Sequence, residues 1–284
     1  MEMKKIGVVG SGTMGGAIAH QAAMTSFDVV LCDVEQQFLE RAIGRMEKWM
    51  SRAIDKGKMN AKEKEEVIER VTTTTSIKDL TDCDVVIEAI IEDLDAKKEV
   101  FRQLDQILKP EALIASNTSS MSITVLAEAT DRPDRVAGMH FFNPPQIMKL
   151  VEVIRGYKTS DDTIKKLKKL AIDLHKEPIE VKKDTPGFIV NRIMIPQFIE
   201  AIRLVEEGVA TPEDIDKAVT LGLNYPMGPF TLQDYAGVDI GLHVMDYFYE
   251  EFKDSRFAAP LTLRNLVRAG RIGKKVGEGW YDYK

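Results

Sequence analysis

Residues 6–15 read IGVVGSGTMG, an apolar run that breaks into glycines spaced G-x-G-x-x-G and then enters a helical pattern. In a strand–turn–helix unit with this spacing, Gly10 turns the chain, Gly12 lets the backbone approach a phosphate, and Gly15 packs the helix against the strand. The helix start adds unpaired N–H groups and the positive end of the helix dipole. The stretch predicts a site for the pyrophosphate of a dinucleotide, with a chance glycine turn as the alternative.

A second apolar run, residues 29–32, ends in Asp33, eighteen residues after Gly15. An acid at this place accepts hydrogen bonds from ribose hydroxyls and repels a 2′-phosphate. The two signals together predict an NAD-binding domain. The alternative for Asp33 is an ordinary helix N-cap.

The composition fits a globular enzyme. The chain has 284 residues, which favours two domains, and 44% of them are apolar and 30% charged. The net charge of −6 argues against a nucleic-acid surface. No stretch approaches the roughly 20 apolar residues that span a membrane. Residues 1–5 lead directly into the first apolar run, so we expect no signal peptide and a cytoplasmic location.

The two cysteines, Cys32 and Cys83, have no CxxC partner and no neighbours suited to bind a metal. We therefore expect reduced thiols and no metal site.

The first half of the chain alternates strand-like and helix-like segments. Continuous apolar runs indicate strands buried on both faces, as in a parallel sheet. We expect a Rossmann-like, doubly wound, mostly parallel α/β sheet with strands at residues 6–9, 29–32, 71–75, 84–90, 113–116, 136–142, 150–154 and 179–181. Helical stretches at 35–55 and 61–70 predict a hairpin insertion, which either covers a ligand or is a plain decoration.

The pattern changes after residue 183. Residues 184–187 form a Pro/Gly breaker cluster, and no strand-like alternation follows it. The helical patterns there cover residues 188–207, 212–221, 230–252 (one helix or two) and 261–269. We therefore predict a nucleotide-binding domain over residues 1–185 and an all-α domain for substrate binding and dimerisation over 186–284.

Polar groups follow two of the predicted strands. Residues 116–120 (SNTSS) follow one strand, His140 closes another, and Glu152 lies inside the next apolar run. Ligands of open parallel sheets bind beyond the carboxyl ends of the strands, so these groups are candidates for proton transfer. Taken singly, the hydroxyl cluster is also consistent with a helix cap, and His140 with a satisfied buried histidine.

These stretches resemble a known family. Residues 115–120, 138–144, 149–153, 183–192 and 225–230 are similar to the motifs of the short-chain L-3-hydroxyacyl-CoA dehydrogenases. The resemblance runs from Ile6 to Tyr283, and the bacterial 3-hydroxybutyryl-CoA dehydrogenases match best in length. It implies NAD-dependent hydride transfer between (S)-3-hydroxybutyryl-CoA and acetoacetyl-CoA, and a homodimer formed through the helical domain.

The resemblance also implies roles for single residues. His140 would be the catalytic acid/base, Glu152 its orienting carboxylate, and Ser119 and Asn191 donors to the substrate oxygens. Arg52 and Lys56 would hold the phosphates of CoA, although solvated helix charges are an equal alternative. The residues implied at the NAD site are Gly10, Ser11, Gly12, Thr13, Met14, Gly15, Asp33, Glu92, Lys97, Ser119, Asn143 and Lys275.

Two other functions remain open on the sequence. Dehydrogenases of the 3-hydroxyacid and 6-phosphogluconate type also begin with a G-x-G-x-M-G stretch, but their chemistry centres on a lysine of the helical domain. A non-catalytic, crystallin-like relative is the other alternative. The set of Ser119, His140, Glu152 and Asn191 favours the CoA enzyme over both.

Overall fold

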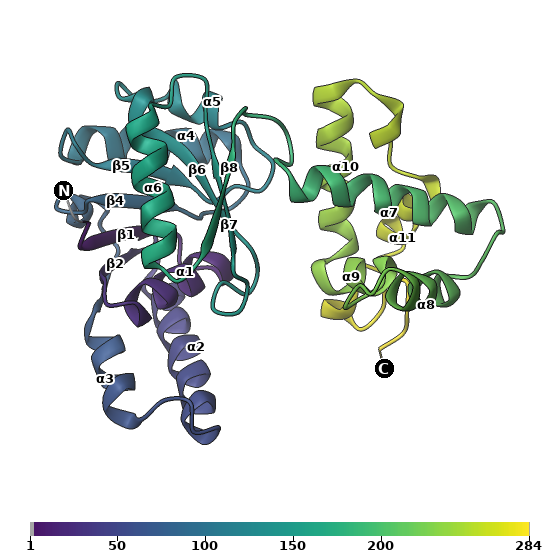
Figure 1. The fold of residues 1–284 in the computed structure, drawn as a ribbon, viewed down its shortest axis with the longest axis horizontal. Helices are drawn as coiled ribbons and strands as arrows, with labels where there is room; N and C mark the ends of the chain where they lie inside the picture. The colour runs from purple at the N-terminus through teal and green to yellow at the C-terminus, as the bar shows by residue number, and fades with distance from the viewer. Residues whose placement is uncertain (1–2, 284) are drawn as a thin grey trace. The chain divides into compact units, whose positions relative to one another are not determined.

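The computed structural model describes residues 3–283, and its first unit is built on one eight-stranded sheet (Figure 1). The strand order is β3-β2-β1-β4-β5-β6-β7-β8, so it reverses between β1 and β4. The strands are β1 (Lys5–Val9), β2 (Asp28–Cys32), β3 (Val71–Thr74), β4 (Val85–Glu88), β5 (Leu113–Ser116), β6 (Val136–Phe141), β7 (Leu150–Ile154) and β8 (Glu177–Val181). The predicted Rossmann-like, mostly parallel sheet is confirmed.

One pair of neighbouring strands departs from the parallel arrangement. β6 and β7 are antiparallel, whereas β7 and β8 are again parallel to each other. The connection between β6 and β7 is eight residues, 142–149, which is shorter than the dozen or more that a parallel crossover requires. The short connection therefore forces the chain to reverse.

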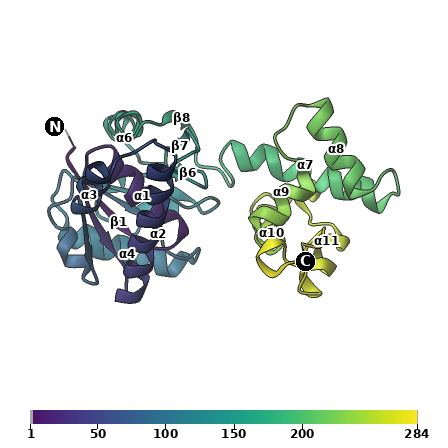
Figure 2. The same ribbon diagram turned by 90° about the horizontal axis from the view of Figure 1, so that it is seen from below.

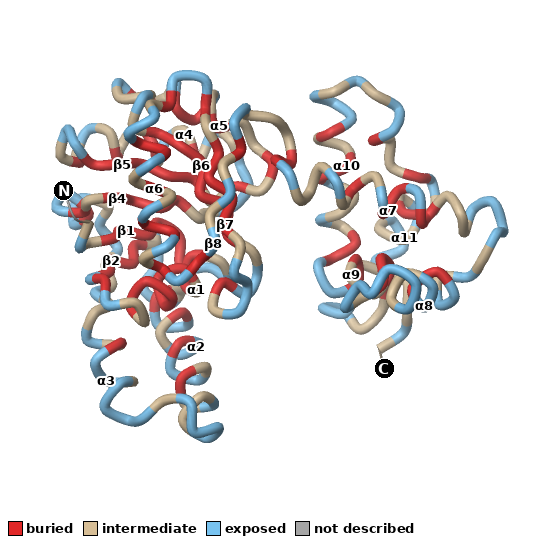
Figure 3. The backbone as a smooth tube through the Cα atoms, in the orientation of Figure 1, coloured by how far each residue is buried: buried red, intermediate tan, exposed pale blue. Residues whose placement is uncertain are grey.

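Helices cover both faces of the sheet. α1 (Thr13–Met24) and α6 (Asp161–Asp173) lie on one side of β1, and α4 (Leu94–Ile107) lies on the other (Figure 2). Apolar residues of α1 and α6 belong to one core with the strands, and Ile6, Val8 and Leu31 in that core are fully buried. Figure 3 shows this buried material running through the strands. α5 (Ile123–Ala127) follows the polar cluster after β5.

The predicted helical hairpin consists of α2 (Gln36–Asp55) and α3 (Ala61–Glu69), which extend beyond the sheet (Figure 1). α2 buries Leu39, Ala42, Met46 and Met50, spaced three or four residues apart, so one face packs and the other is solvated. Asn60 and Glu63 form a capping box at the start of α3.

The second unit begins at Pro186 and is all-helical. Its helices are α7 (Val190–Glu206), α8 (Pro212–Gly222), α9 (Pro229–Ala236), α10 (Val238–Phe252) and α11 (Leu261–Arg268). Gly237, at φ +108°, separates α9 from α10, a conformation that glycine adopts without steric cost. Phe230, Phe248 and Phe257 lie in a core of their own. No helix within residues 3–283 is both long and apolar enough to cross a bilayer.

Candidate active site

The turn between β1 and α1 has the geometry of a phosphate loop. Gly10 has φ +95°, and a Cβ there would lie 2.5 Å from the carbonyl oxygen of Ala89. A Cβ on Gly15 would lie 1.8 Å from the carbonyl oxygen of Gly10, so both positions require glycine. At Gly12, in contrast, no atom lies within 4 Å of the added Cβ, and no side chain caps the N-terminus of α1. The open surface over uncapped N–H groups fits a pyrophosphate.

Asp33 follows β2 and faces this turn. Its Oδ2 accepts hydrogen bonds from the backbone N of Ser11 at 2.6 Å and from Ser11 Oγ at 2.7 Å, and its Oδ1 accepts from Val34 N at 2.7 Å. The residue at the N-cap of α2 is Glu35, so the helix-cap alternative for Asp33 is wrong. Asp33 is thus tied to the second residue of the glycine motif.

Arg45 is a residue at this turn that the sequence reading missed. It reaches from α2 and donates through Nη2 to the carbonyl oxygens of Ser11, at 2.7 Å, and Gly12, at 3.2 Å. Nothing in the glycine motif itself points to a residue more than thirty positions later.

The antiparallel pairing of β6 and β7 places His140 directly opposite Glu152. His140 Nδ1 lies 2.8 Å from Glu152 Oε2, and the two side chains are 8% and 0% exposed. A carboxylate at Nδ1 fixes the tautomer that carries its proton there and orients the ring, so the ring exchanges protons through Nε2. The pair is therefore suited to general acid/base chemistry.

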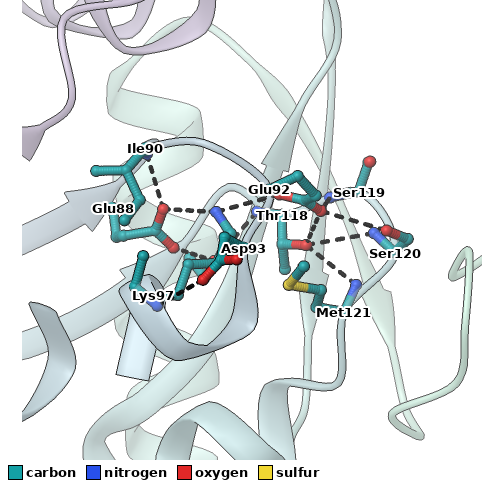
Figure 4. Close-up of polar contacts among 11 residues, drawn as sticks. Glu88, Ile90, Glu92, Asp93, Lys97, Thr118, Ser119, Ser120 and Met121 are labelled. Carbon is teal, nitrogen blue, oxygen red and sulfur yellow. Dashed lines mark hydrogen bonds and ion pairs between the residues drawn. The ribbon is translucent and has the colours of Figure 1, made fainter. Parts of the chain in front are cut away.

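The loop after β5 is organised by Glu92 (Figure 4). Its Oε1 accepts hydrogen bonds from Thr118 Oγ1, from the backbone N of Ser119 at 3.3 Å and from Ser120 Oγ at 3.2 Å. The N-cap of α5 is Ser122, outside the hydroxyl cluster at 116–120. The cluster therefore serves the loop that presents Ser119 rather than a helix end.

A buried ion pair lies beside this loop. Lys97 Nζ, on α4, is 2.6 Å from Glu88 Oε1 and 3.1 Å from Glu92 Oε2, and Lys97 is 1% exposed (Figure 4). Burial alone would raise the pKa of Glu92, but the charge of Lys97 and the hydrogen bond from Thr118 outweigh it and lower that pKa. Glu92 is therefore ionised at neutral pH.

Glu88 is a second residue that the sequence reading missed. It is the last residue of β4, it is fully buried, and it is an acid that follows the apolar residues 85–87. An acid after a strand-like run was part of the signal for Asp33, and that part applies to Glu88 as well.

Two buried side chains, His20 and Lys176, fix the connection between β6 and β7, which contains Asn143. Gln146 Nε2 lies 3.1 Å from Nδ1 of the fully buried His20 on α1, and Lys176 Nζ donates to the carbonyl oxygen of Pro145. Asn143 thus lies two residues past the end of β6, in a held loop at the same sheet edge as His140.

The remaining predicted residues lie elsewhere in the chain. Arg52 on α2 and Lys56 at the C-cap of that helix are exposed, and Arg45, Trp49, Arg52 and Lys56 recur at a helical spacing. Asn191 is in the first turn of α7, in the second unit, and Lys275 of that unit forms an ion pair with Asp239 at 2.7 Å. The geometry leaves the predicted roles of these four residues as predictions.

Comparison with known proteins gives a consistent result over the whole chain. The family model described as the NAD binding domain of 3-hydroxyacyl-CoA dehydrogenase matches residues 5–185, and the model of the C-terminal domain of the same enzyme matches residues 187–283. The first match confirms NAD as the predicted cofactor.

Individual relatives cover the chain equally well. A probable 3-hydroxybutyryl-CoA dehydrogenase of Deinococcus radiodurans is 48% identical, over 98% of this chain and 100% of the relative. The 3-hydroxybutyryl-CoA dehydrogenase of Clostridioides difficile is 43% identical, over 98% of this chain and 99% of the relative. The crystal structure of (S)-3-hydroxybutyryl-CoA dehydrogenase from Ralstonia eutropha has a TM-score of 0.96 and 42% identity, with both chains fully covered.

Proposed function

The chain belongs to the 3-hydroxyacyl-CoA dehydrogenase family, as its motifs predicted, and from that premise we propose that it interconverts (S)-3-hydroxybutyryl-CoA and acetoacetyl-CoA. Bound NAD supplies the hydride acceptor for oxidation and, when reduced, the donor for the reverse reaction. The observation that carries the proposal is the buried His140–Glu152 pair on adjacent strands of a nucleotide-binding sheet. Its Nδ1 and Oε2 atoms lie 2.8 Å apart.

His140 moves the proton. In oxidation the neutral ring takes the proton of the 3-hydroxyl group as hydride leaves C3, and in reduction the protonated ring returns it to the forming alkoxide. Such a transfer contributes about 10²–10⁴-fold to the rate. Glu152 holds the ring in place through Nδ1 and stabilises its cation. Ser119 and Asn191 donate hydrogen bonds to the substrate oxygens.

Asp33 selects the cofactor. Its carboxylate, held beside the glycine turn by Ser11, accepts from the ribose hydroxyls and repels a 2′-phosphate. We expect a preference for NADH over NADPH that falls in Asp33→Asn. Asp28→Asn is the matched control, because Asp28 is an exposed acid at the other end of the same strand. Equal kcat/KM for the two reduced cofactors in the unaltered protein would contradict this role.

The other cofactor residues follow from the resemblance. Gly10 to Gly15 surround the pyrophosphate, while Glu92, Lys97, Asn143 and Lys275 line the remainder of the NAD site. Arg52 and Lys56 bind the phosphates of CoA, since they place two exposed cations on the projecting hairpin.

We further propose that the protein acts as a cytoplasmic homodimer joined through its helical unit. That unit exposes large apolar side chains on successive elements, namely Ile193 on α7, Leu221 on α8, Leu223 and Tyr225. Large apolar side chains left exposed to solvent are often found at protein interfaces. Sedimentation of the protein, alone and with Leu221 and Leu223 both changed to Ser, measures whether they hold a dimer.

The decisive test is an assay of NADH oxidation with acetoacetyl-CoA and with longer 3-oxoacyl-CoAs up to C16. We expect turnover with the C4 substrate and none with 3-oxo acids that lack CoA. Turnover of a free 3-hydroxyacid alone would point to the 3-hydroxyacid dehydrogenase type. Absence of turnover together with intact NADH binding would point to a non-catalytic relative.

A further inference from the structure

Glu88 holds a fixed negative charge inside the protein. Its Oε1 accepts from the backbone N of Ile90 at 2.8 Å and from Lys97 Nζ at 2.6 Å, and its Oε2 accepts from Ser116 Oγ at 2.7 Å. Every one of these partners donates, so the group is satisfied as a carboxylate. Figure 4 shows Glu88, Lys97 and Glu92 side by side.

The charges in this cluster do not cancel. Glu88 and Glu92 are two carboxylates that share a single ammonium group, that of Lys97, and within residues 3–283 no second cation forms an ion pair with either of them. The cluster of Glu88, Lys97 and Glu92 therefore carries a net charge of −1. Glu88 and Lys97 are almost completely buried, whereas the side chain of Glu92 is 32% exposed, so the excess charge is turned towards the sheet edge.

The strand order places this cluster under one half of the cofactor. A dinucleotide lies across the point where the strand order reverses, here between β1 and β4. Asp33 follows β2 and takes the adenosine half, so the nicotinamide half extends over β4 and β5. Glu88 ends β4, and its neighbour Ala89 contacts the glycine turn at Gly10.

We infer that the cluster of Glu88, Lys97 and Glu92 biases the site towards the oxidised cofactor, because the nicotinamide ring is a cation in NAD⁺ and neutral in NADH. The inference rests on the NAD-dependent function proposed above. Glu88 and Lys97 are positioning residues: they touch each other and Glu92, and they set the charge that the ring meets. Because the ion pair is removed from water, salt screens it little.

The test measures the dissociation constants of NAD⁺ and NADH by calorimetry, and the quantity of interest is the ratio of the NADH constant to the NAD⁺ constant. Glu88→Gln makes the cluster neutral, and we expect the ratio to fall by about tenfold, the order of effect of one charge in a partly buried site. Lys97→Gln removes the cation of the cluster, so the ratio should not fall.

The double variant separates charge from structure. Glu88→Gln with Lys97→Gln restores a net charge of −1, so the ratio should return to that of the unaltered protein although the ion pair is gone. If the role is purely structural, the ratio in the double variant should differ from that of the unaltered protein at least as much as in either single variant. Glu99→Gln is the matched control, because Glu99 is an exposed acid on the same helix, paired with Arg102, and its ratio should not change.

The inference is overturned if the ratio is unchanged in Glu88→Gln. It is also overturned if the ratio in the double variant does not return to that of the unaltered protein. If Glu88→Gln does not fold by circular dichroism, Glu92→Gln removes the same charge at a partly exposed position and must lower the ratio in its place. If the unaltered protein binds neither nucleotide, the proposed function fails instead, so the two failures are distinguishable.

Discussion

Two buried glutamates, on two strands of one sheet, have different kinds of partner. Glu152 on β7 faces the ring of His140, an imidazole that can both donate and accept a proton. Glu88 on β4 faces the ammonium group of Lys97 and accepts in addition from Ser116 and the backbone of Ile90. The residue type and the burial are the same in both places.

The difference shows that the partner decides what a buried carboxylate does. Beside an imidazole ring, Glu152 fixes the tautomer and orients the ring, which suits a group that must transfer a proton. Beside an ammonium group and two further donors, Glu88 has hydrogen-bond partners that all donate to its carboxylate. The two roles lead to predictions that run from the largest expected effect to the smallest.

The largest effect is expected where the moving proton is removed. His140→Gln should lower kcat by about 10²–10⁴-fold, because the reaction loses its proton donor and acceptor. The dissociation constant of NADH should not change, since the glycine turn and Asp33 are untouched. His243→Gln, at an exposed histidine of the second unit, is the control. Near-normal turnover of the His140 variant would show that another group moves the proton.

His20 sharpens the comparison as a buried histidine without a carboxylate. Burial lowers the pKa of His20 from 6.5 to about 4. Above pH 6.5 it is neutral folded and unfolded, but as the pH falls from 6.5 to 4 the unfolded chain takes up a proton that the folded protein does not, and stability is lost. The loss attributable to His20 approaches about 3 kcal/mol at pH 4.

Denaturant unfolding between pH 4 and pH 7 measures this loss of stability. His20→Gln should flatten the loss of stability below pH 6.5 relative to the unaltered protein, and His243→Gln should not. Parallel curves for the His20 variant and the unaltered protein would mean that His20 is protonated in the folded state.

Much of this arrangement could be predicted from the sequence, because it depends on local patterns. The glycine spacing, the acid at Asp33 and the apolar runs identified the sheet, and the motifs placed His140 and Glu152 on neighbouring strands. The strand direction was also present in the chain length: eight residues between β6 and β7 are too few for a parallel crossover. That count predicts antiparallel strands, whereas the register that sets His140 opposite Glu152 comes from the structure.

The contacts of Glu88 and Arg45 could not be read in the same way. Glu88 contacts Lys97 in the first turn of α4 and Ser116 on the neighbouring strand β5. Arg45 contacts the glycine turn only because α2 packs on α1. Such contacts arise from packing between elements, for which a single sequence carries no periodic signal. Asn191 and Lys275 belong to the second unit, so their roles rest on the family resemblance.

The two glutamates should differ in their effect on the pH profile. Glu152→Gln removes the carboxylate that faces His140 Nδ1, so reductive activity, which needs a proton on that ring, should be lost at a lower pH than in the unaltered protein. Glu88→Gln should change the affinity ratio of the two cofactors and leave the pH profile in place. Initial rates of acetoacetyl-CoA reduction from pH 5 to 9 compare them. The same pH shift in both variants would erase the distinction.

The smallest effect contrasts buried with exposed charges. Arg52 and Lys56 are exposed on the hairpin, and exposed ionic contacts contribute about 0.2–1 kcal/mol each, so changing both to Ala should raise KM for acetoacetyl-CoA by a few-fold. KM for NADH should not change. Because exposed charges are screened over about 8–10 Å, this increase should shrink as salt is added.

Lys62→Ala and Glu66→Ala together, an exposed ion pair on α3, provide the control on the same hairpin. In the same salt series the cofactor ratio of the unaltered protein should stay constant, since its Glu88–Lys97 ion pair is buried. An acyl-CoA KM that is unaffected by the double change at any salt concentration would return Arg52 and Lys56 to the solvated face of a helix and leave the CoA phosphates to other residues.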